Sequence, residues 1–278
     1  MRWQDLRPSS NIEDRRGLGG GMALGGGSIG FVILAAVIYL CSGGDPRQLL
    51  DQISGGSTEV QQQTQTVSNS SGPAVDQNRR FAAAIMGSTE DVWSKILPEQ
   101  ARVKYTPPTL VLFDNQTQSA CGYSVAATGP FYCPGDRKLY LDFSFFRELE
   151  RDFKAKGDFA QAYVIAHEVG HHVQNLLGTM DKVQRAGDSN RLSVALELQA
   201  DCYAGVWGYY AQKQGVLEPG DAEEALTAAS AVGDDMIQKR TQGYVVPDSF
   251  THGSSAQRMQ YFARGMQTGD MRQCQTIR

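Results

Sequence analysis

The sequence predicts an α+β fold: a mostly helical domain with a small, partly antiparallel sheet, together with one N-terminal transmembrane helix. Short β-prone runs separated by Gly, Pro and Asn gather between residues 105 and 142, and helical patterns dominate after them. A small sheet followed by helices is typical of α+β proteins. The chain has 278 residues, of which 41% are apolar and 20% charged, and this composition suits a folded globular body.

The stretch 22–41 contains no charged residue, and its second half is strongly apolar. Twenty helical residues span about 30 Å, which is enough to cross the hydrocarbon core of a bilayer. Four arginines precede the stretch, whereas Arg47 is the one basic residue in the thirty that follow it. The positive-inside rule then predicts a single-pass protein of the cytoplasmic membrane, with residues 1–21 in the cytoplasm and the rest on the extracytoplasmic side. A cleaved signal peptide is the alternative, although no Ala-x-Ala site follows the stretch.

Residues 42–76 are rich in Ser, Gly, Gln and Thr and predict a flexible tether, so that the folded domain covers residues 77–278. Its first part, around residues 81–97, predicts one or two amphipathic helices, the second starting at Ser88 or Thr89. Three or four strands are expected from the β-prone runs 109–113, 121–125, 131–133 and 138–142. Helices are expected over 143–155, 159–178, 190–213, 221–239 and 254–267.

Four cysteines follow the apolar stretch, apart from Cys41 at its end. An even number in an exported domain allows two disulfides with three possible pairings. Cys121 and Cys133 flank a segment with the pattern of a hairpin, which favours a bond between them and, by elimination, a second bond between Cys202 and Cys274. Buried free thiols are the alternative for the second pair, because Cys202 lies on an apolar helix face.

The charge balance argues against nucleic acid as a partner, because a net charge of −4 and a pI near 5.6 give no basic field for phosphate backbones. The histidines are more informative. The chain has four, and His167, His171 and His172 lie within six residues of one another.

The pentapeptide His167-Glu168-Val169-Gly170-His171 predicts a zinc site. Two histidines four apart on a helix share one face, so their imidazoles can converge on one tetrahedral ion. Glu168 is offset by one position and can act as the general base on an attacking water. Surface histidines brought together by coincidence are the alternative, but the surrounding residues are apolar, as expected for a buried helix.

The third zinc ligand is predicted to be Glu197, since the zincin variant with a third histidine six residues after the second is excluded. Zincins with a third histidine carry Gly and His where this chain has Gln174 and Leu177. Glu197 and Asp201 lie four apart on an otherwise apolar helical pattern, where two acids need a reason to be present. Glu197 can bind the metal while Asp201 accepts the N–H of a ligand histidine, most simply His167. The alternative is a solvated acidic stripe.

The fourth histidine, His252, precedes a helix and is a candidate to stabilise the oxyanion of a tetrahedral intermediate. A helix-capping segment or a surface position are the alternatives. His172 points about 100° away from His171 and is expected to be structural rather than a ligand.

The chain resembles the neutral zinc metallopeptidase family of bacteria, also called YpfJ-like proteins. The resemblance runs over nearly the whole chain and includes the strings Ala120-Cys-Gly-Tyr-Ser124, Gly129-Pro-Phe-Tyr-Cys-Pro134, Tyr140-Leu-Asp-Phe-Ser-Phe-Phe146, His167-Glu-Val-Gly-His-His-Val-Gln174, Glu197-Leu-Gln-Ala-Asp-Cys202 and Thr251-His-Gly-Ser-Ser-Ala-Gln-Arg258. It implies a zincin-like fold and association with the bacterial cytoplasmic membrane. The Glu-x-x-Ala-Asp element is similar to that of gluzincins, which implies a ligand role for Glu197 and an orienting role for Asp201.

The sequence therefore predicts a membrane-anchored, zinc-dependent metallopeptidase with one Zn²⁺. Its partners are expected to be the lipid bilayer and a peptide or protein substrate in the cell envelope. Such a substrate could pair with the strands that precede the active-site helix. Two alternatives remain at this stage: a zinc amidase or endopeptidase acting on peptidoglycan, and a non-catalytic zincin scaffold in an envelope complex.

Overall fold

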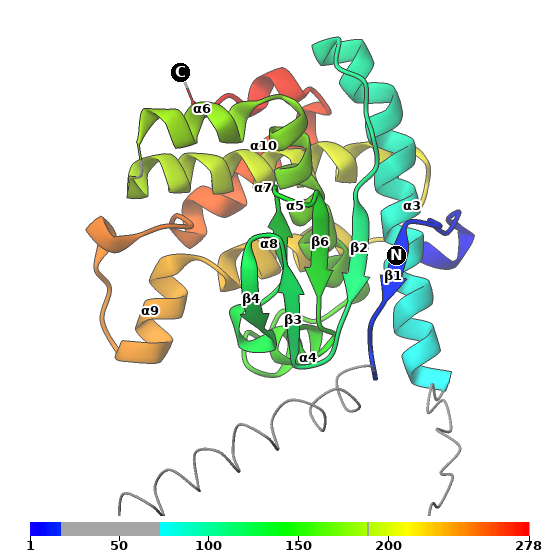
Figure 1. Ribbon diagram of the computed structural model, residues 1–278, viewed down its shortest axis with the longest axis horizontal. Coiled ribbons are helices and arrows are strands. Elements are labelled where there is room, and N and C mark those ends of the chain that lie inside the picture. The colour runs from blue at the N-terminus through cyan, green and yellow to red at the C-terminus, as the bar shows by residue number, and fades with distance from the viewer. Residues whose placement is uncertain (18–72, 188, 278) are drawn as a thin grey trace, which may run out of the picture. The chain divides into compact units, whose positions relative to one another are not determined.

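The computed structural model describes residues 1–17, 73–187 and 189–277 (Figure 1). One compact unit contains Met1–Arg15 together with Pro73–Arg278. The first fifteen residues thus belong to the same unit as the predicted domain 77–278. The predicted span 22–41 and most of the tether lie outside the described residues. Within the described parts of the chain, no helix is both long and apolar enough to cross a membrane.

The main sheet is mixed and has the strand order β1-β2-β6-β5. β1, β2 and β6 are parallel, and β5 runs antiparallel to β6 at the other edge. A separate antiparallel hairpin is formed by β3 and β4. The strands are β1 (Ile12–Asp14), β2 (Thr109–Leu112), β3 (Gln116–Ser119), β4 (Gly122–Val125), β5 (Phe131–Cys133) and β6 (Lys138–Leu141).

The α+β class and the four predicted strand runs agree with the structure, but β1 and β3 were not predicted. Their sequences, Ile-Glu-Asp and Gln-Thr-Gln-Ser, are too polar to show a strand pattern. β1 arises because backbone groups of the N-terminal segment pair with β2, an event that side-chain patterning does not report.

Helices make up most of the rest of the unit. They are α3 (Pro73–Ala101), α4 (Ser144–Arg151), α5 (Asp158–Leu176), α6 (Thr179–Ala186), α7 (Asn190–Lys213), α8 (Asp221–Ala231), α9 (Asp234–Gln242) and α10 (Ser255–Thr268). Short 3₁₀ turns lie at Trp3–Asp5, Ala126–Thr128, Pro247–Ser249 and Met271–Cys274.

Two of the predicted helical regions differ from the structure for identifiable reasons, and α6 was not predicted. The first helical region is a single helix, α3, because the Thr89 hydroxyl donates to the carbonyl of Met86 at 2.8 Å within the helix instead of capping a new one. The region 221–239 is divided at Gly233, where α8 ends and α9 begins. A Cβ at Gly233 would lie 2.4 Å from the backbone nitrogen of Ser255, so the start of α10 packs directly against the break between the two helices.

α5 and α7 pack closely, and this contact positions the candidate site. At Gly170, inside the pentapeptide, a Cβ would lie 2.9 Å from the carbonyl oxygen of Ala200 on α7. α7 and α10 approach in the same way at Gly205 and Gly265. Behind these contacts the rings of Phe159 and Trp207 stack in the core, with centroids 5.5 Å apart.

The structure contains both predicted disulfides. Cys121 in the turn before β4 bonds to Cys133 at the end of β5, and Cys202 on α7 bonds to Cys274 near the C-terminus. The first ties the hairpin β3–β4 to the edge strand of the main sheet. The second holds the C-terminal turn against α7.

Candidate metal centre and active-site cleft

His167 and His171 project from one face of α5, and Glu197 approaches them from α7. Their donor atoms all lie within 4.8 Å of one another. Glu197 Oε2 lies 3.1 Å from His167 Nε2, and Glu197 Oε1 lies 3.4 Å from His171 Nε2. Ligands about 2.0–2.1 Å from a tetrahedral zinc are about 3.3 Å apart, so these two separations are close to those between neighbouring ligands of a zinc site. Two imidazoles and a carboxylate are also a donor set that zinc accepts.

The other ring nitrogen of each histidine is held by the protein. His167 Nδ1–H donates to Asp201 Oδ1 at 2.8 Å, and His171 Nδ1–H donates to Gln174 Oε1 at 2.9 Å. The Gln174 amide is itself oriented, because its Nε2 donates to the carbonyl of Leu196 at 2.7 Å. Both rings therefore keep Nε2 directed toward Glu197, which is the arrangement expected of metal ligands.

Asp201 is fully buried and forms the centre of a charged network. The guanidinium of Arg258 donates to both of its carboxylate oxygens, at 2.8 and 2.9 Å. The hydroxyl of Tyr163 donates to Oδ1 as well. Burial opposes ionisation of Asp201, but the charge of Arg258 and the hydrogen bond from His167 outweigh it and hold its pKa below the ordinary value. The carboxylate thus stays charged while it orients His167.

Glu168 follows His167 on α5 and lines the same cleft. Its side chain is buried, with the residue 8% exposed. Burial raises its pKa above the usual value, although the neighbouring His171 and His167 act in the opposite direction. A carboxyl group with these surroundings and this location is suited to exchange protons with a reacting group.

His252 also lines the cleft, but it lies outside the cluster of metal donors. Its Nδ1 is 3.1 Å from Asp234 Oδ1. The same carboxylate accepts the backbone N–H groups of Thr251, His252 and Gly253 through Oδ2. The hydrogen bond to Asp234 raises the pKa of His252 above its ordinary value. Asp234, at the start of α9, therefore holds both the loop and the ring.

The cleft that contains these groups has a volume of about 720 Å³. One wall is formed by the edge strand β5 and the residues just before it, including Gly129 and Pro130. Away from the charged floor, the lining is largely apolar and includes Phe131, Phe145, Phe153, Val164 and Ile237. A cleft of this size and character suits a polypeptide segment with apolar side chains.

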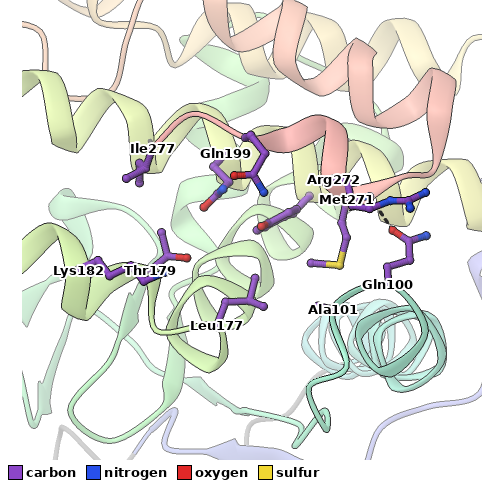
Figure 2. Close-up of a pocket in the computed structure, with 11 residues that line it drawn as sticks. Gln100, Ala101, Leu177, Thr179, Lys182, Gln199, Met271, Arg272 and Ile277 are labelled. Atoms are coloured by element: carbon purple, nitrogen blue, oxygen red, sulfur yellow. Dashed lines mark hydrogen bonds between the residues drawn. The ribbon is translucent and has the colours of Figure 1, made fainter.

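A second cavity of about 320 Å³ lies elsewhere, where the end of α3 meets α7 and the C-terminal turn (Figure 2). Its polar lining consists of amide, basic and hydroxyl side chains, among them Gln100, Gln199, Lys182 and Arg272. None of its lining residues is a histidine, cysteine or acid. It therefore offers none of the usual protein ligands of zinc.

His172 is structural, as predicted. Its Nδ1 lies 3.0 Å from the Tyr132 hydroxyl, and its Nε2 lies 2.7 Å from the carbonyl oxygen of Thr106. Burial lowers its pKa to about 4, so the ring is neutral and joins α5 to the sheet.

The structure thus brings His167, Glu168, His171, Glu197 and Asp201 together, and it places His252 on the rim of the same cleft. Sequence reasoning gave no role to four residues that support the site: Tyr163, Gln174, Asp234 and Arg258. Of these, Arg258 offered a signal, since it lies one turn into a helix that follows a candidate catalytic histidine. The partners of the other three are 3 to 38 positions away and follow no fixed spacing.

Comparison with known proteins agrees with this geometry. The family model described as "putative neutral zinc metallopeptidase" matches residues 1–277. The chain is 46% identical over 290 aligned residues to the uncharacterized protein YpfJ of Escherichia coli K12, covering 100% of this chain and 99% of that protein. It is 47% identical over 202 residues to the uncharacterized protein Mb2605 of Mycobacterium bovis, covering 68% of this chain and 67% of that protein. No solved structure matches the chain. Full-length coverage by the family model and by a relative of this identity shows that the chain belongs to the putative neutral zinc metallopeptidase family.

Proposed function

We propose that this protein is a zinc-dependent peptidase that hydrolyses peptide bonds in the cleft above α5. The observation that carries the proposal is the triangle of donor atoms from His167, His171 and Glu197, with Glu168 beside it on the floor of a 720 Å³ cleft. Polarisation of the scissile carbonyl and acidification of the attacking water are the chemistry that a zinc ion supplies when bound at such a site.

The remaining steps belong to side chains of this chain. Glu168 takes a proton from the attacking water and returns it to the leaving amine, which requires a carboxylate that faces the cleft. Asp201 and Gln174 keep the two ligand imidazoles in the tautomer that leaves Nε2 free. His252 is held by Asp234 and kept protonated by its raised pKa, so its other ring nitrogen donates a hydrogen bond to the oxyanion that develops on the carbonyl oxygen.

We propose that the substrate is an extended peptide that adds to β5. This strand is at the edge of the main sheet, and the residues before it line the cleft. An edge strand offers unpaired backbone groups to which a peptide can hydrogen-bond, while the apolar lining receives its side chains. The two disulfides support placing the peptidase domain in an oxidising compartment, so we propose a substrate in the cell envelope.

The test uses the full chain, Glu168→Gln, and Glu223→Gln as a control for an exposed glutamate outside the cleft. Zinc content is measured by mass spectrometry and turnover with broad peptide and muropeptide libraries. We expect about one zinc per chain in all three proteins, and a loss of turnover of about 10²- to 10⁴-fold in Glu168→Gln alone.

Each other outcome contradicts the proposal in its own way. Equal turnover in Glu168→Gln and the unmodified chain would show that Glu168 is not the general base. Cleavage of muropeptides without cleavage of peptides would favour the peptidoglycan amidase. Zinc without turnover of any substrate would favour the non-catalytic scaffold.

A further inference from the structure

The segment Met1–Arg15, called here the N-terminal segment, lies along α3 and the edge of the main sheet (Figure 1). Its strand β1 pairs in parallel with β2, with Ile12 opposite Leu110. The N–H of Leu110 donates to the carbonyl of Asn11 at 2.9 Å, and the N–H of Arg15 donates to the carbonyl of Leu112 at 2.8 Å. Without the segment, this side of β2 would be an open edge with unpaired backbone groups.

The N-terminal segment also crosses α3 at Gly87. The N–H of Ser9 donates to the carbonyl of Ala83 at 2.8 Å. A Cβ at Gly87 would lie 1.9 Å from the carbonyl oxygen of Arg7, and its three nearest atoms all belong to the segment. The missing side chain at Gly87 is therefore what allows the two backbones to touch.

A buried carboxylate on α3 depends on the same segment. Glu90 is 6% exposed and accepts hydrogen bonds from Arg7 at 3.0 Å, from Asn11 at 2.8 Å and from the hydroxyl of Ser9. A buried carboxylate that loses such partners is strongly unfavourable. The segment is thus required for α3 to fold with Glu90 inside.

The start of the N-terminal segment reaches the active-site helix itself. The ammonium group of Met1 donates to Asp158, the first residue of α5, at 2.7 Å, and to Asp221, the first residue of α8, at 3.2 Å. The N–H of Arg2 donates to the carbonyl of Val216 at 2.8 Å. The segment therefore contacts the sheet, α3 and the N-terminus of the helix that carries the pentapeptide.

We infer that the N-terminal segment is an integral part of the catalytic domain, so that it lies on the same side of any membrane as the candidate zinc site. Strand pairing and hydrogen bonds at 2.7–3.0 Å need direct contact, whereas a bilayer core separates its two sides by about 30 Å. The inference replaces the expected arrangement of a cytoplasmic segment 1–21 and an extracytoplasmic domain. It rests on packing contacts and is independent of whether the protein is a peptidase.

The first test compares two exposed positions in the full chain. Asp5 in the segment has a side chain that is 64% exposed, and Tyr244 in the domain is 63% exposed. Asp5→Cys and Tyr244→Cys are made separately in a Cys41→Ser background. Intact and lysed bacterial cells are then treated with a membrane-impermeant maleimide.

We expect both cysteines to react in intact cells or both to react only after lysis. Either result places the two positions on one side. Labelling of one cysteine in intact cells while the other requires lysis would overturn the inference.

The second test uses the sign of a stability change at Gly87. Replacing glycine by alanine inside a helix normally stabilises it. Because a Cβ at this position meets the backbone of Arg7, we expect Gly87→Ala instead to lower the Tm of the full chain, by about 5 °C for a domain of this size. Ser94→Ala, at an exposed position of the same helix, is the control and should leave the Tm nearly unchanged. An unchanged or raised Tm in Gly87→Ala would show that the segment does not pack there.

Discussion

At the scale of single residues, the site depends on groups that surround the donor atoms. Asp201 is 0% exposed and Arg258 is 4% exposed, so neither charge is stabilised by water. Each is stabilised by the other and by the hydroxyl of Tyr163, and Asp201 is stabilised also by His167. Removing one member of such a network leaves an uncompensated charge inside the protein, which costs far more than the loss of a surface ion pair.

Arg258→Met should therefore lower the free energy of unfolding by about 3–5 kcal/mol, because Asp201 loses both hydrogen bonds to the guanidinium while it stays buried. Urea denaturation at neutral pH measures the change. Arg272→Met is the matched control, since Arg272 forms its ion pair with Asp270 at the surface and its side chain is 71% exposed. That variant should change stability by less than about 1 kcal/mol. Similar losses in the two variants would contradict the role given to the buried network.

Much of the site was predictable at this scale, because its chemistry is local in sequence. The four-residue spacing of His167 and His171, and of Glu197 and Asp201, follows from the helical period. The support provided by Arg258 and Asp234 was not predictable, since it depends on how α10 packs against α7 and how α9 packs against α8 and α10. A single sequence contains no direct information on that packing.

At the scale of elements, close helix contacts decide whether the donors meet. α5 and α7 carry the two halves of the candidate metal site, and they touch where Gly170 faces the backbone of Ala200. Gly170 is thus required for the close packing of α5 against α7, which its position in the pentapeptide does not reveal.

Gly170→Ala should weaken zinc binding, because the added Cβ would lie 2.9 Å from the carbonyl oxygen of Ala200 and push α5 away from Glu197. Stability should fall by roughly 1–3 kcal/mol, as for overpacking of other cores. Competition with a chelating dye measures zinc affinity, and urea denaturation measures stability. Gly208→Ala is the control: its Cβ would meet the thioether of Met266 away from the site, so zinc affinity should be retained. Unaltered zinc affinity in Gly170→Ala would show that the helix contact does not set the ligand geometry.

The same scale explains which elements sequence patterns predict well. α5, α7 and α10 are long, have apolar faces and end near their predicted limits. β1, β3 and α6 are short and polar, so no local pattern predicted them; β1 is stabilised by pairing with β2, which is distant in the sequence. The division between α8 and α9 depends on the close contact of Gly233 with the start of α10, and a local sequence pattern does not report such a contact.

At the scale of the whole molecule, the N-terminal segment belongs to the same compact unit as the domain, which composition alone does not predict. A boundary at residue 77 follows from composition, since residues 42–76 are poor in large apolar groups. Composition does not show that the segment before the apolar stretch pairs with β2 in the main sheet. It also does not show that the ammonium group of Met1 forms ion pairs with Asp158 and Asp221. Through these contacts the amino terminus contributes to the stability of α5, the helix that carries the pentapeptide.

The stability of the protein should consequently depend on pH through the ammonium group of Met1. Burial opposes its charge, but the hydrogen bond and charge of Asp158 outweigh this effect and raise its pKa from 8.0 to about 10. A group whose pKa is raised by folding stabilises the folded state fully below its unfolded pKa and loses that contribution as the pH rises through the folded value. The contribution should therefore be complete below about pH 8 and disappear between about pH 8 and 10.

Urea midpoints measured across this range for the full chain and for Asp158→Asn should differ most near neutral pH and converge above pH 10. Asp181→Asn, which changes an acid in the first turn of the neighbouring helix α6, should run parallel to the unmodified chain throughout. A constant difference between Asp158→Asn and the unmodified chain would mean that the ammonium group is not bound at the start of α5.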